Sequence, residues 1–330
     1  MTYRREILLA VIILALIVAV GMRAPAFVTP SSLVDVLSDT SCLFMLTLAE
    51  AAVLLTRGID LSIAANLALT GMVVALANHA APGVPIIAIV ALAVVFGAGL
   101  GLINAALIAG LGIPPIVVTL GTLAVYRGMI FVIAHGAWLT SKDMSPAFLA
   151  VPKAEFLGLS SLIWIAALVS IAAWAFLNHT AAGRALYAVG GNPVAARYCG
   201  IDLGRQQLTV YTLAGAVAGL CGYLWVSRFG IAYSDIALGY ELTVIAACVI
   251  GGVSIAGGVG SVAGALLGAL FLGVIVNALP VINVSPFWQM AISGAVILAA
   301  VIVNSRSERQ SGKLILPEAR RKAASVSGGA

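Results

Sequence analysis

Ten apolar segments alternate with short polar connections along the chain, and this alternation is its dominant pattern. The segments are Ile7–Met22, Cys42–Leu55, Leu61–Ala77, Val84–Leu111, Ile116–Ala134, Leu157–Leu177, Leu208–Val226, Thr243–Ile255, Ser261–Leu279 and Phe287–Val303. A helix of about 20 apolar residues crosses the hydrocarbon core of a bilayer. The pattern therefore predicts an all-α fold, a polytopic transmembrane helical bundle with about 10 spans, in a range of roughly 8–11.

Two of these segments are too short for a complete crossing, namely Cys42–Leu55 and Thr243–Ile255. Short or glycine-interrupted segments at corresponding places in two halves of a chain are typical of broken or re-entrant helices beside a transport path. We therefore expect broken helices here. The sequence also allows an inverted repeat, in which Asp60–Asn78 corresponds to Gly258–Leu279.

The composition restricts the chain to a membrane. Hydrophobic residues make up 62% of it and charged residues only 9%, whereas soluble proteins contain about 25% charged residues. So few charges cannot cover a soluble surface, which excludes a soluble globule, and the apolar excess excludes a disordered or collagen-like chain. The formal net charge is +5, but the basic residues are scattered, which argues against nucleic acid as a partner.

The basic residues instead predict the orientation of the chain. They gather at the N-terminus with Arg4 and Arg5, in the segment 178–207, and in the tail 304–330. Basic loops favour the cytoplasm, and six spans before 178–207 with four after it would place all three regions, and both termini, there. We expect a transmembrane domain at 1–303 with a cytoplasmic loop at 178–207, and a basic, disordered cytoplasmic tail at 304–330.

The N-terminal segment also has the pattern of a secretory signal, because a basic pair precedes an apolar run and Ala24-Pro25-Ala26 imitates a cleavage site. Many further apolar segments follow it. We therefore interpret Ile7–Met22 as an uncleaved first transmembrane helix.

The chain shows no sequence pattern for covalent chemistry. Gly312-Lys313-Leu314 lacks the first glycine and the Ser/Thr of a phosphate-binding loop. The glycines within Gly97–Gly101 have the wrong spacing for a dinucleotide site, and close helix packing explains them better. The cysteines have no metal-ligand spacing and are interpreted as packing residues; they are Cys42, Cys199, Cys221 and Cys248. We expect no catalytic residue, no metal site and no cofactor bound by this chain.

Polar residues within or beside the apolar segments are the candidate path residues. They are Arg57, Asp60, Asn66, Asn104, Thr119, Thr122, Arg127, Glu241 and Asn277. A charge at the bilayer centre costs about 2.5–3.5 kcal/mol or more, so such residues face a bundle interior or an aqueous cavity. They could line a polar translocation path or brace the helices. Arg57 and Asp60 are three residues apart, and we predict that they pair and brace a helix break after Gly58.

The segment 183–201 has the chemistry of a docking element. Asn192 is an N-cap before Pro193 at the first helical position, and Gly200 closes about two short turns. Small alanines beside Arg197 describe a compact helix that fits the groove of a partner. A plain connecting loop does not need these features.

Taken together, four blocks of sequence resemble the membrane permease subunit of a bacterial ABC importer, in the ribose/xylose/rhamnose/autoinducer-2 branch. The blocks are Thr56-Arg-Gly-Ile-Asp-Leu-Ser; Gly101-Leu-Ile-Asn-Ala-Ala with Val118-Thr-Leu-Gly-Thr-Leu and Tyr126-Arg-Gly; Gly183–Ile201; and Tyr240–Ser254 with Gly257-Gly-Val-Gly-Ser. The resemblance spans Arg57 to Asn304, about three quarters of the chain, with the blocks in family order. The chain departs from the family at Ala64-Ala65 and at Asn104-Ala105, where small residues are kept.

The resemblance implies an inner-membrane, multi-pass protein that translocates a monosaccharide or sugar-like molecule and is not itself an enzyme. Its implied partners are an ATP-binding subunit that uses ATP and Mg, a periplasmic sugar-binding protein, a second permease chain (an identical copy or a paralogue) and membrane lipid. The coupling element that contacts the ATP-binding subunit would comprise Gly183, Arg184, Gly190, Gly191, Asn192, Ala195, Ala196, Arg197 and Gly200. The alternatives are an ion-coupled secondary transporter of a small polar solute, with Asp60 and Glu241 as ion sites, and a membrane assembly protein without transport.

Overall fold

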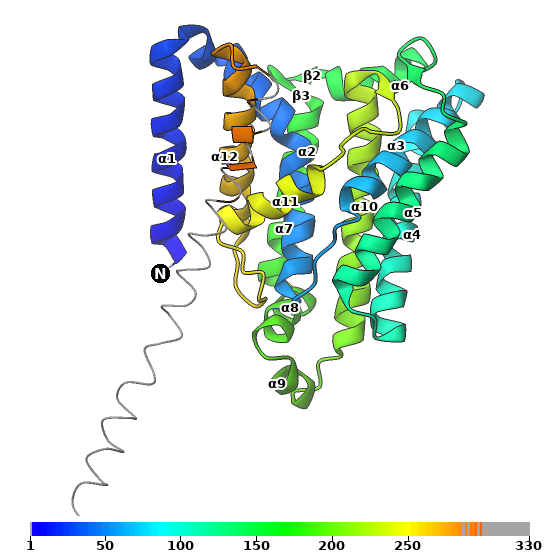
Figure 1. Ribbon diagram of the computed structural model, residues 1–330, viewed down its shortest axis with the longest axis vertical. Coiled ribbons are helices and arrows are strands. Elements are labelled where there is room, and N and C mark those ends of the chain that lie inside the picture. Colours follow the sequence, from blue (N-terminus) through cyan, green and yellow to red (C-terminus); the bar gives the residue numbers. More distant parts are fainter. Residues whose placement is uncertain (1, 286–287, 289–290, 293, 296–297, 299–330) are drawn as a thin grey trace, which may run out of the picture.

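The computed structural model describes residues 2–285, 288, 291–292, 294–295 and 298 (Figure 1). Its long helices are α1 Thr2–Arg23, α2 Pro30–Leu55, α3 Ile63–Ala80, α4 Ile86–Ala105, α5 Pro115–Ala134, α7 Ser161–His179, α10 Leu203–Phe229 and α12 Val262–Val281. Its shorter helices are α6 Pro146–Ala150, α8 Ala181–Gly191, α9 Pro193–Tyr198 and α11 Tyr240–Ile250. A π-helical turn, Ala106–Gly110, extends α4, and 3₁₀ turns occur at Pro25–Val28 and Val151–Lys153.

Strands are a minor part of the described chain. β1 Leu139–Thr140 pairs antiparallel with β4 Ile231–Ala232, and β2 Glu155–Phe156 pairs antiparallel with β3 Leu159–Ser160. Both pairs lie in connections between helices. The predicted all-α, polytopic bundle is thereby confirmed.

The membrane-crossing helices follow the predicted order. Eight described helices are long and apolar enough to cross a membrane, and α1, α2, α3, α4, α5 and α7 precede α8. With these six crossings the N-terminal end of α1 and the α8–α9 region lie at the same end of the molecule in Figure 1, as the charge pattern predicts. The predicted segment Phe287–Val303 and the tail 304–330 lie almost wholly outside the described residues.

α2 is the central helix of the bundle, packed against α10, α12, α7 and α11. It begins at Pro30, where the Thr29 hydroxyl accepts a hydrogen bond from the Ser32 amide and the proline occupies the first turn. Because α2 has 26 residues, the prediction that Cys42–Leu55 is an incomplete crossing is wrong. In its N-terminal half the hydroxyl residues Ser38, Thr40 and Ser41 are buried, and the Thr40 hydroxyl donates to a carbonyl oxygen one turn earlier.

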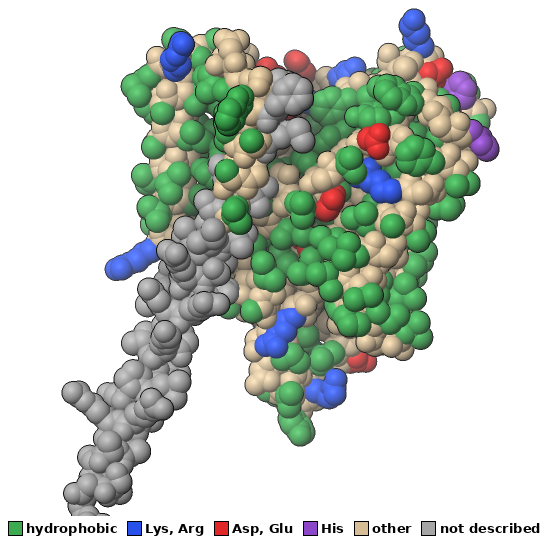
Figure 2. Space-filling model, in the orientation of Figure 1, with side chains coloured by type: hydrophobic (Ala, Val, Ile, Leu, Met, Phe, Trp, Pro, Cys, Tyr) green, Lys and Arg blue, Asp and Glu red, His purple; other side chains and the backbone are tan. Residues whose placement is uncertain are grey.

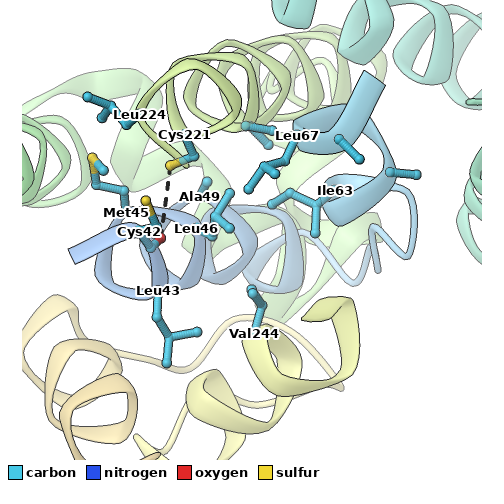
Figure 3. Packing of buried hydrophobic residues seen from close by; sticks show 14 of the residues in the cluster. Cys42, Leu43, Met45, Leu46, Ala49, Ile63, Leu67, Cys221, Leu224 and Val244 are labelled. Carbon is cyan, nitrogen blue, oxygen red and sulfur yellow. Dashed lines mark hydrogen bonds between the residues drawn. The ribbon is translucent and has the colours of Figure 1, made fainter. Parts of the chain in front are cut away.

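Figure 3 shows the core on both sides of α2. Leu46 and Ala49 lie between α2 and the side chain of Leu67 on α3, while Leu43 points towards α11, which carries Val244. Cys221 on α10 donates to the Cys42 carbonyl oxygen. The interpretation of the cysteines as packing residues holds for Cys42, Cys221 and Cys248, which are buried, whereas Cys199 is exposed.

α4 and α10 make the most extensive helix contact of the described chain. Gly97 and Gly101 on α4 lie directly against Gly215 and Gly219 on α10, and a Cβ at Gly101 would overlap the Tyr211 carbonyl oxygen. Small residues let membrane helices approach to backbone contact, where dispersion and Cα–H contacts replace the hydrophobic effect. The packing interpretation of these glycines is confirmed.

Two helices of the bundle are interrupted. Residues 56–62 separate α2 from α3, and residues 251–261 separate the 11-residue α11 from α12. The prediction that Thr243–Ile255 is an incomplete crossing is therefore confirmed, and Figure 1 shows α11 lying across the middle of the bundle. Each interruption precedes one of the two segments that we matched as a repeat. The inverted relation between them stays a prediction.

The end of the molecule opposite α9 is closed by the α5–α7 connection. The hydroxyls of Tyr223 and Ser227 on α10 both donate to the Phe148 carbonyl oxygen of α6. Close by, Arg228 on α10 forms an ion pair with Asp39 on α2. These contacts hold α2, α6 and α10 together at this end of the molecule.

The surface matches a lipid environment. In Figure 2 the middle of the visible face is mostly hydrophobic, and its charges gather at the two ends and in one small group. Large apolar side chains are exposed along α1, α4, α5 and α7, among them Leu8, Val95, Val132 and Leu168. A soluble protein rarely exposes so much apolar area. These helices therefore form the outer surface that faces lipid.

We predict that Gly101→Ala lowers the free energy of unfolding by about 1–3 kcal/mol, because the added methyl group forces α4 and α10 apart. Gly99→Ala is the matched control, since a Cβ at Gly99 meets no atom within 4 Å. It should be neutral or slightly stabilising, because alanine favours helix over glycine. Thermal unfolding in detergent measures both variants, and equal behaviour would contradict the close packing.

Candidate functional site

Three segments far apart in the sequence meet where α8 ends. The Arg57 guanidinium donates from Nε to the Gly190 carbonyl oxygen at 2.7 Å and from Nη2 to the Gly191 carbonyl oxygen at 3.1 Å. The Gly258 amide donates to the Leu55 carbonyl oxygen at 3.0 Å. Both helix interruptions therefore bind to each other, and one of them binds the last turn of α8. We call this contact the α8 junction.

The α8 junction depends on close backbone approach. A Cβ at Gly190 would overlap the Leu55 carbonyl oxygen and the Gly258 amide. Gly258 itself has a φ of +73° and lies against the Gly191 backbone, a conformation that favours glycine. Arg57 adds a positive charge to the negative end of the α8 dipole. The end of α8 is thus held both by shape and by charge.

Two caps connect α8 and α9. The Thr180 hydroxyl accepts from the Gly183 amide at the start of α8. The Asn192 side chain accepts from the Val194 and Ala195 amides at 3.1 and 3.0 Å and starts α9 at Pro193. These geometries confirm the predicted N-cap. The segment 178–207, expected to be a loop with one short helix, instead contains two consecutive helices.

The predicted coupling residues divide into two sets. Gly183, Gly190 and Ala196 are buried and hold the two helices against the bundle, whereas Arg184, Gly191, Asn192, Ala195, Arg197 and Gly200 are exposed. Gly200 has a φ of +80°, as its predicted role in closing α9 requires. Burial raises the pKa of Tyr187 on α8, so this hydroxyl stays neutral at physiological pH.

α9 presents an exposed apolar and basic surface beside these residues. Val194 is 65% exposed and Tyr198 is 87% exposed. They line a shallow cavity of about 240 Å³ together with Pro193 and Arg197. The sequence analysis did not select Val194 or Tyr198, although an aromatic residue next to Arg197 is the kind of side chain that anchors protein interfaces.

The predicted pairing of Arg57 with Asp60 is wrong. Both lie in the interruption, which begins at Thr56 rather than after Gly58, so helical spacing does not apply to them. Arg57 has a φ of +66° and extends to α8. Asp60 points inward, and its Oδ1 accepts from the Ser62 amide and hydroxyl at 2.9 and 2.6 Å.

Asp60 belongs to a buried polar network that holds the interruption. The Asn104 amide of α4 donates to the Ser62 hydroxyl at 2.8 Å. The Glu50 carboxylate on α2 accepts from the Asp60 amide at 3.1 Å. Asp60, Glu50 and Asn104 are all almost fully buried. Glu50 was not among the predicted residues, because nothing in the sequence shows that the connection after α2 folds back against that helix.

A second set of bonds fixes the Ile59 carbonyl oxygen in the same interruption. It accepts from the Thr119 hydroxyl of α5 at 3.1 Å and from the Tyr211 hydroxyl of α10 at 3.4 Å. Tyr211 was not predicted, since a tyrosine in an apolar span resembles ordinary core. The interruption is therefore bonded to α2, α4, α5 and α10. In the described structure Asp60, Asn104 and Thr119 brace helices.

Three other predicted residues lie apart from this network. Asn66 on α3 donates to the Gly97 carbonyl oxygen of α4 at 3.0 Å. Thr122 and Asn277 bond to carbonyls of their own helices, α5 and α12. Thr122 is buried and Asn277 is partly exposed. Asn66 joins two helices, whereas the side chains of the other two residues form hydrogen bonds within their own helices.

Arg127 holds the segment that leads into α11. From α5 its guanidinium donates to the carbonyl oxygens of Ser234, Ile236 and Ala237 at 2.7–3.2 Å. The carboxylates of Glu241 and Asp235 act on it electrostatically. Arg127 and Glu241 are only partly buried. They are the two predicted residues that the structure brings together at a surface.

Within the described residues, no group of three or more His, Cys, Asp or Glu side chains has the arrangement of a metal site. The carboxylates Glu50 and Asp60 instead bond to backbone amides of the interruption. The geometry of the site is that of a mechanical connection between the α8–α9 pair and the bundle.

Comparisons with known proteins agree with this geometry. Residues 32–301 match the family model described as branched-chain amino acid transport system / permease component. The chain is 36% identical over 300 residues, 90% of this chain and 92% of the relative, to the ribose import permease protein of Escherichia coli. It is 36% identical over 303 residues, 92% and 87% of the two chains, to the autoinducer 2 import system permease protein of an Enterobacter species.

A further relative is the galactose/methyl galactoside import permease protein of Escherichia coli, 34% identical over 324 residues that cover 92% of this chain and 95% of the relative. No solved structure matches the chain at a significant level.

We predict that Arg57→Met loosens the α8 junction. Losing the contacts to two carbonyls at the end of α8 costs about 1 kcal/mol, so the α9 amides should exchange hydrogen roughly fivefold faster. Hydrogen exchange with mass spectrometry of the detergent-solubilised chain measures this. Arg184→Met is the control on α8 itself and should leave α9 exchange unchanged. Equal exchange in the two variants would show that Arg57 does not hold α8.

Proposed function

Because the chain belongs to the family of branched-chain amino acid transport system permease components, we propose that it is the permease subunit of an ATP-driven sugar importer. It lies in the bacterial inner (plasma) membrane and crosses it several times, as its apolar helices require. Its substrate is a monosaccharide or a sugar-like molecule. Relatives named for ribose, galactose and autoinducer 2 import support this substrate class.

The α8 junction is the observation that supports this proposal, because it connects the α8–α9 pair to both helix interruptions. α9 offers Val194, Arg197 and Tyr198 at the surface, at the same end as the N-terminus. This end is cytoplasmic by the positive-inside rule. An ATP-binding subunit that grips α9 would move α8, and Arg57 and Gly258 would pass that movement to both helix interruptions. ATP and Mg are bound and used by that partner, and the permease performs no hydrolysis.

The same proposal includes two further partners, a binding protein and a second permease chain. A periplasmic sugar-binding protein docks at the opposite end, where α6 and the short strands lie (Figure 1). A second permease chain, identical or paralogous, completes the translocation path. A path that closes and opens needs differential stability of two states rather than a covalent step in this chain.

The predicted path residues have different roles in this proposal. Asp60, Asn66, Asn104 and Thr119 are buried and brace the bundle, whereas Thr122 and Asn277 bond within their own helices. Arg127 and Glu241 are partly exposed beside α11, so they are the candidates for a polar path. Arg57 transmits movement. Glu50 Oε1 and Asp60 Oδ1 accept backbone amides of the interruption, as bracing groups do, while Glu50 Oε2 has no hydrogen-bond partner among the described residues.

We predict that Arg197→Glu uncouples transport from ATP hydrolysis. Exposed arginines in interface hot spots contribute about 2 kcal/mol or more, so hydrolysis stimulated by the binding protein should fall roughly thirtyfold. The assay uses the complete transporter in proteoliposomes. Membrane insertion should persist, because Arg197 makes no contact with the bundle that the structure records. Arg23→Glu, an exposed basic residue in the last turn of α1, away from both α6 and α9 (Figure 1), is the control, and unchanged stimulation in Arg197→Glu would refute the coupling role of α9.

We further predict that uptake into vesicles survives collapse of the ion gradients but stops when ATP is removed. Only a partner that hydrolyses ATP accounts for this pattern. Uptake that instead follows a proton or sodium gradient would identify a secondary transporter and would overturn the proposal.

A further inference from the structure

An apolar groove runs along the membrane-spanning part of the molecule between α7 and α10. Its floor is the face of α2 formed by Met45, Leu48, Ala49 and Ala52. α7 and α10 each pack against α2 and form the two walls. The volume is about 300 Å³, at the lower end of the range for small-molecule sites, roughly 300–1,000 Å³. The groove therefore has room for a narrow apolar chain.

The groove exists because small residues alternate with large ones along its sides. Ala172 and Ala173 on α7 and Ala214 on α10 line it, where larger side chains would close it. Its rim is open to the surroundings, since Leu213 is 45% exposed and Ala172 is also exposed. Every lining residue is apolar. Lipid hydrocarbon fits this lining, whereas a sugar or a polar peptide would lose its hydrogen bonds there.

A basic residue follows the glycine that packs against the end of the groove nearest α8. The α7 wall ends with Phe176 and Leu177, and Gly183 of α8 packs directly against their backbone. Arg184 is the next residue and is exposed. Arg205 is exposed at the start of α10, at the same end. Within the described residues neither guanidinium forms an ion pair, so both are available to an anionic group.

The charge determines which occupant binds. Between lipid tails and an apolar groove there is no hydrophobic driving force, so packing alone does not select one lipid. A phosphate at Arg184 does select, because basic residues at the cytoplasmic surface attract anionic headgroups. From these contacts we propose that the groove holds an acyl chain of an anionic phospholipid whose headgroup lies at Arg184.

Such a lipid would touch the elements that carry the proposed coupling. Its chain would lie against α2, the helix that leads into Arg57, and its headgroup would lie on α8. A bound lipid would therefore fill the space between α7 and α10 and restrict their approach. The site does not depend on which solute is transported, so its test is separate from that of the proposed function.

The test uses the full chain in nanodiscs of equal parts phosphatidylcholine and phosphatidylglycerol, followed by native mass spectrometry. The wild-type chain should retain phosphatidylglycerol. Ala173→Leu fills the groove and Arg184→Gln removes the charge, and each should lower retention by roughly fivefold. Ala167→Leu is the matched control, because Ala167 lines a different apolar groove on α7, with Leu37 and Leu266, and it should retain the lipid.

A photoreactive amino acid at position 213 supplies the second measurement. The chain that carries this amino acid and is otherwise wild type should yield an adduct with the mass of a phospholipid. An adduct with a second permease chain, or with a peptide of residues 287–303, would show that protein covers the groove and would overturn the proposal. Equal retention of phosphatidylcholine, or unchanged retention in Ala173→Leu, would overturn it as well.

Discussion

A broken helix inside a bilayer must find protein partners for its free backbone groups, because the hydrocarbon offers no water. This constraint explains the centre of the molecule. In the interruption between α2 and α3, the Ile59 carbonyl oxygen accepts hydroxyls from α5 and α10, and the Asp60 amide donates to Glu50. The Leu55 carbonyl oxygen accepts the Gly258 amide of the other interruption. The polar residues of the core stabilise the breaks, and the breaks in turn hold the helices around them.

The same constraint connects the core to the surface. Arg57 leaves the first interruption and satisfies carbonyls at the end of α8, so the α8–α9 pair is tied to the place where the bundle is least regular. Regular helices resist bending, whereas an interruption can change its backbone angles at low cost. A partner that pulls α9 would therefore act on the connections that interrupt the helices. At the opposite end the Arg228–Asp39 pair and the α6 contacts fix α2 to α10.

Short sequence motifs correctly predicted the features that depend only on residues adjacent in the chain. Asn192-Pro193 starts a helix as expected, and Gly200 closes α9, because caps and turns involve only a few consecutive residues. The predictions failed where contacts between distant segments determine the structure. Cys42–Leu55 looked too short because Ser38, Thr40 and Ser41 precede it, yet these hydroxyls are buried in the bundle. Arg57 and Asp60 looked like a pair, yet each has its partner elsewhere.

By itself the sequence determined the membrane class, the order of the helices and the capped helix of the α9 region. These follow from hydropathy, charge and local hydrogen bonding, which are properties of adjacent residues. Only the tertiary structure decided that Glu50 and Tyr211 hold the first interruption, that Arg57 binds α8, and that Val194 and Tyr198 face outward. Those contacts join residues more than 100 positions apart, or depend on how the connection after α2 folds back against that helix. The hydrophobic and polar pattern of a single chain does not show which distant residues come together, because burial and side-chain pairing are determined only when the helices pack.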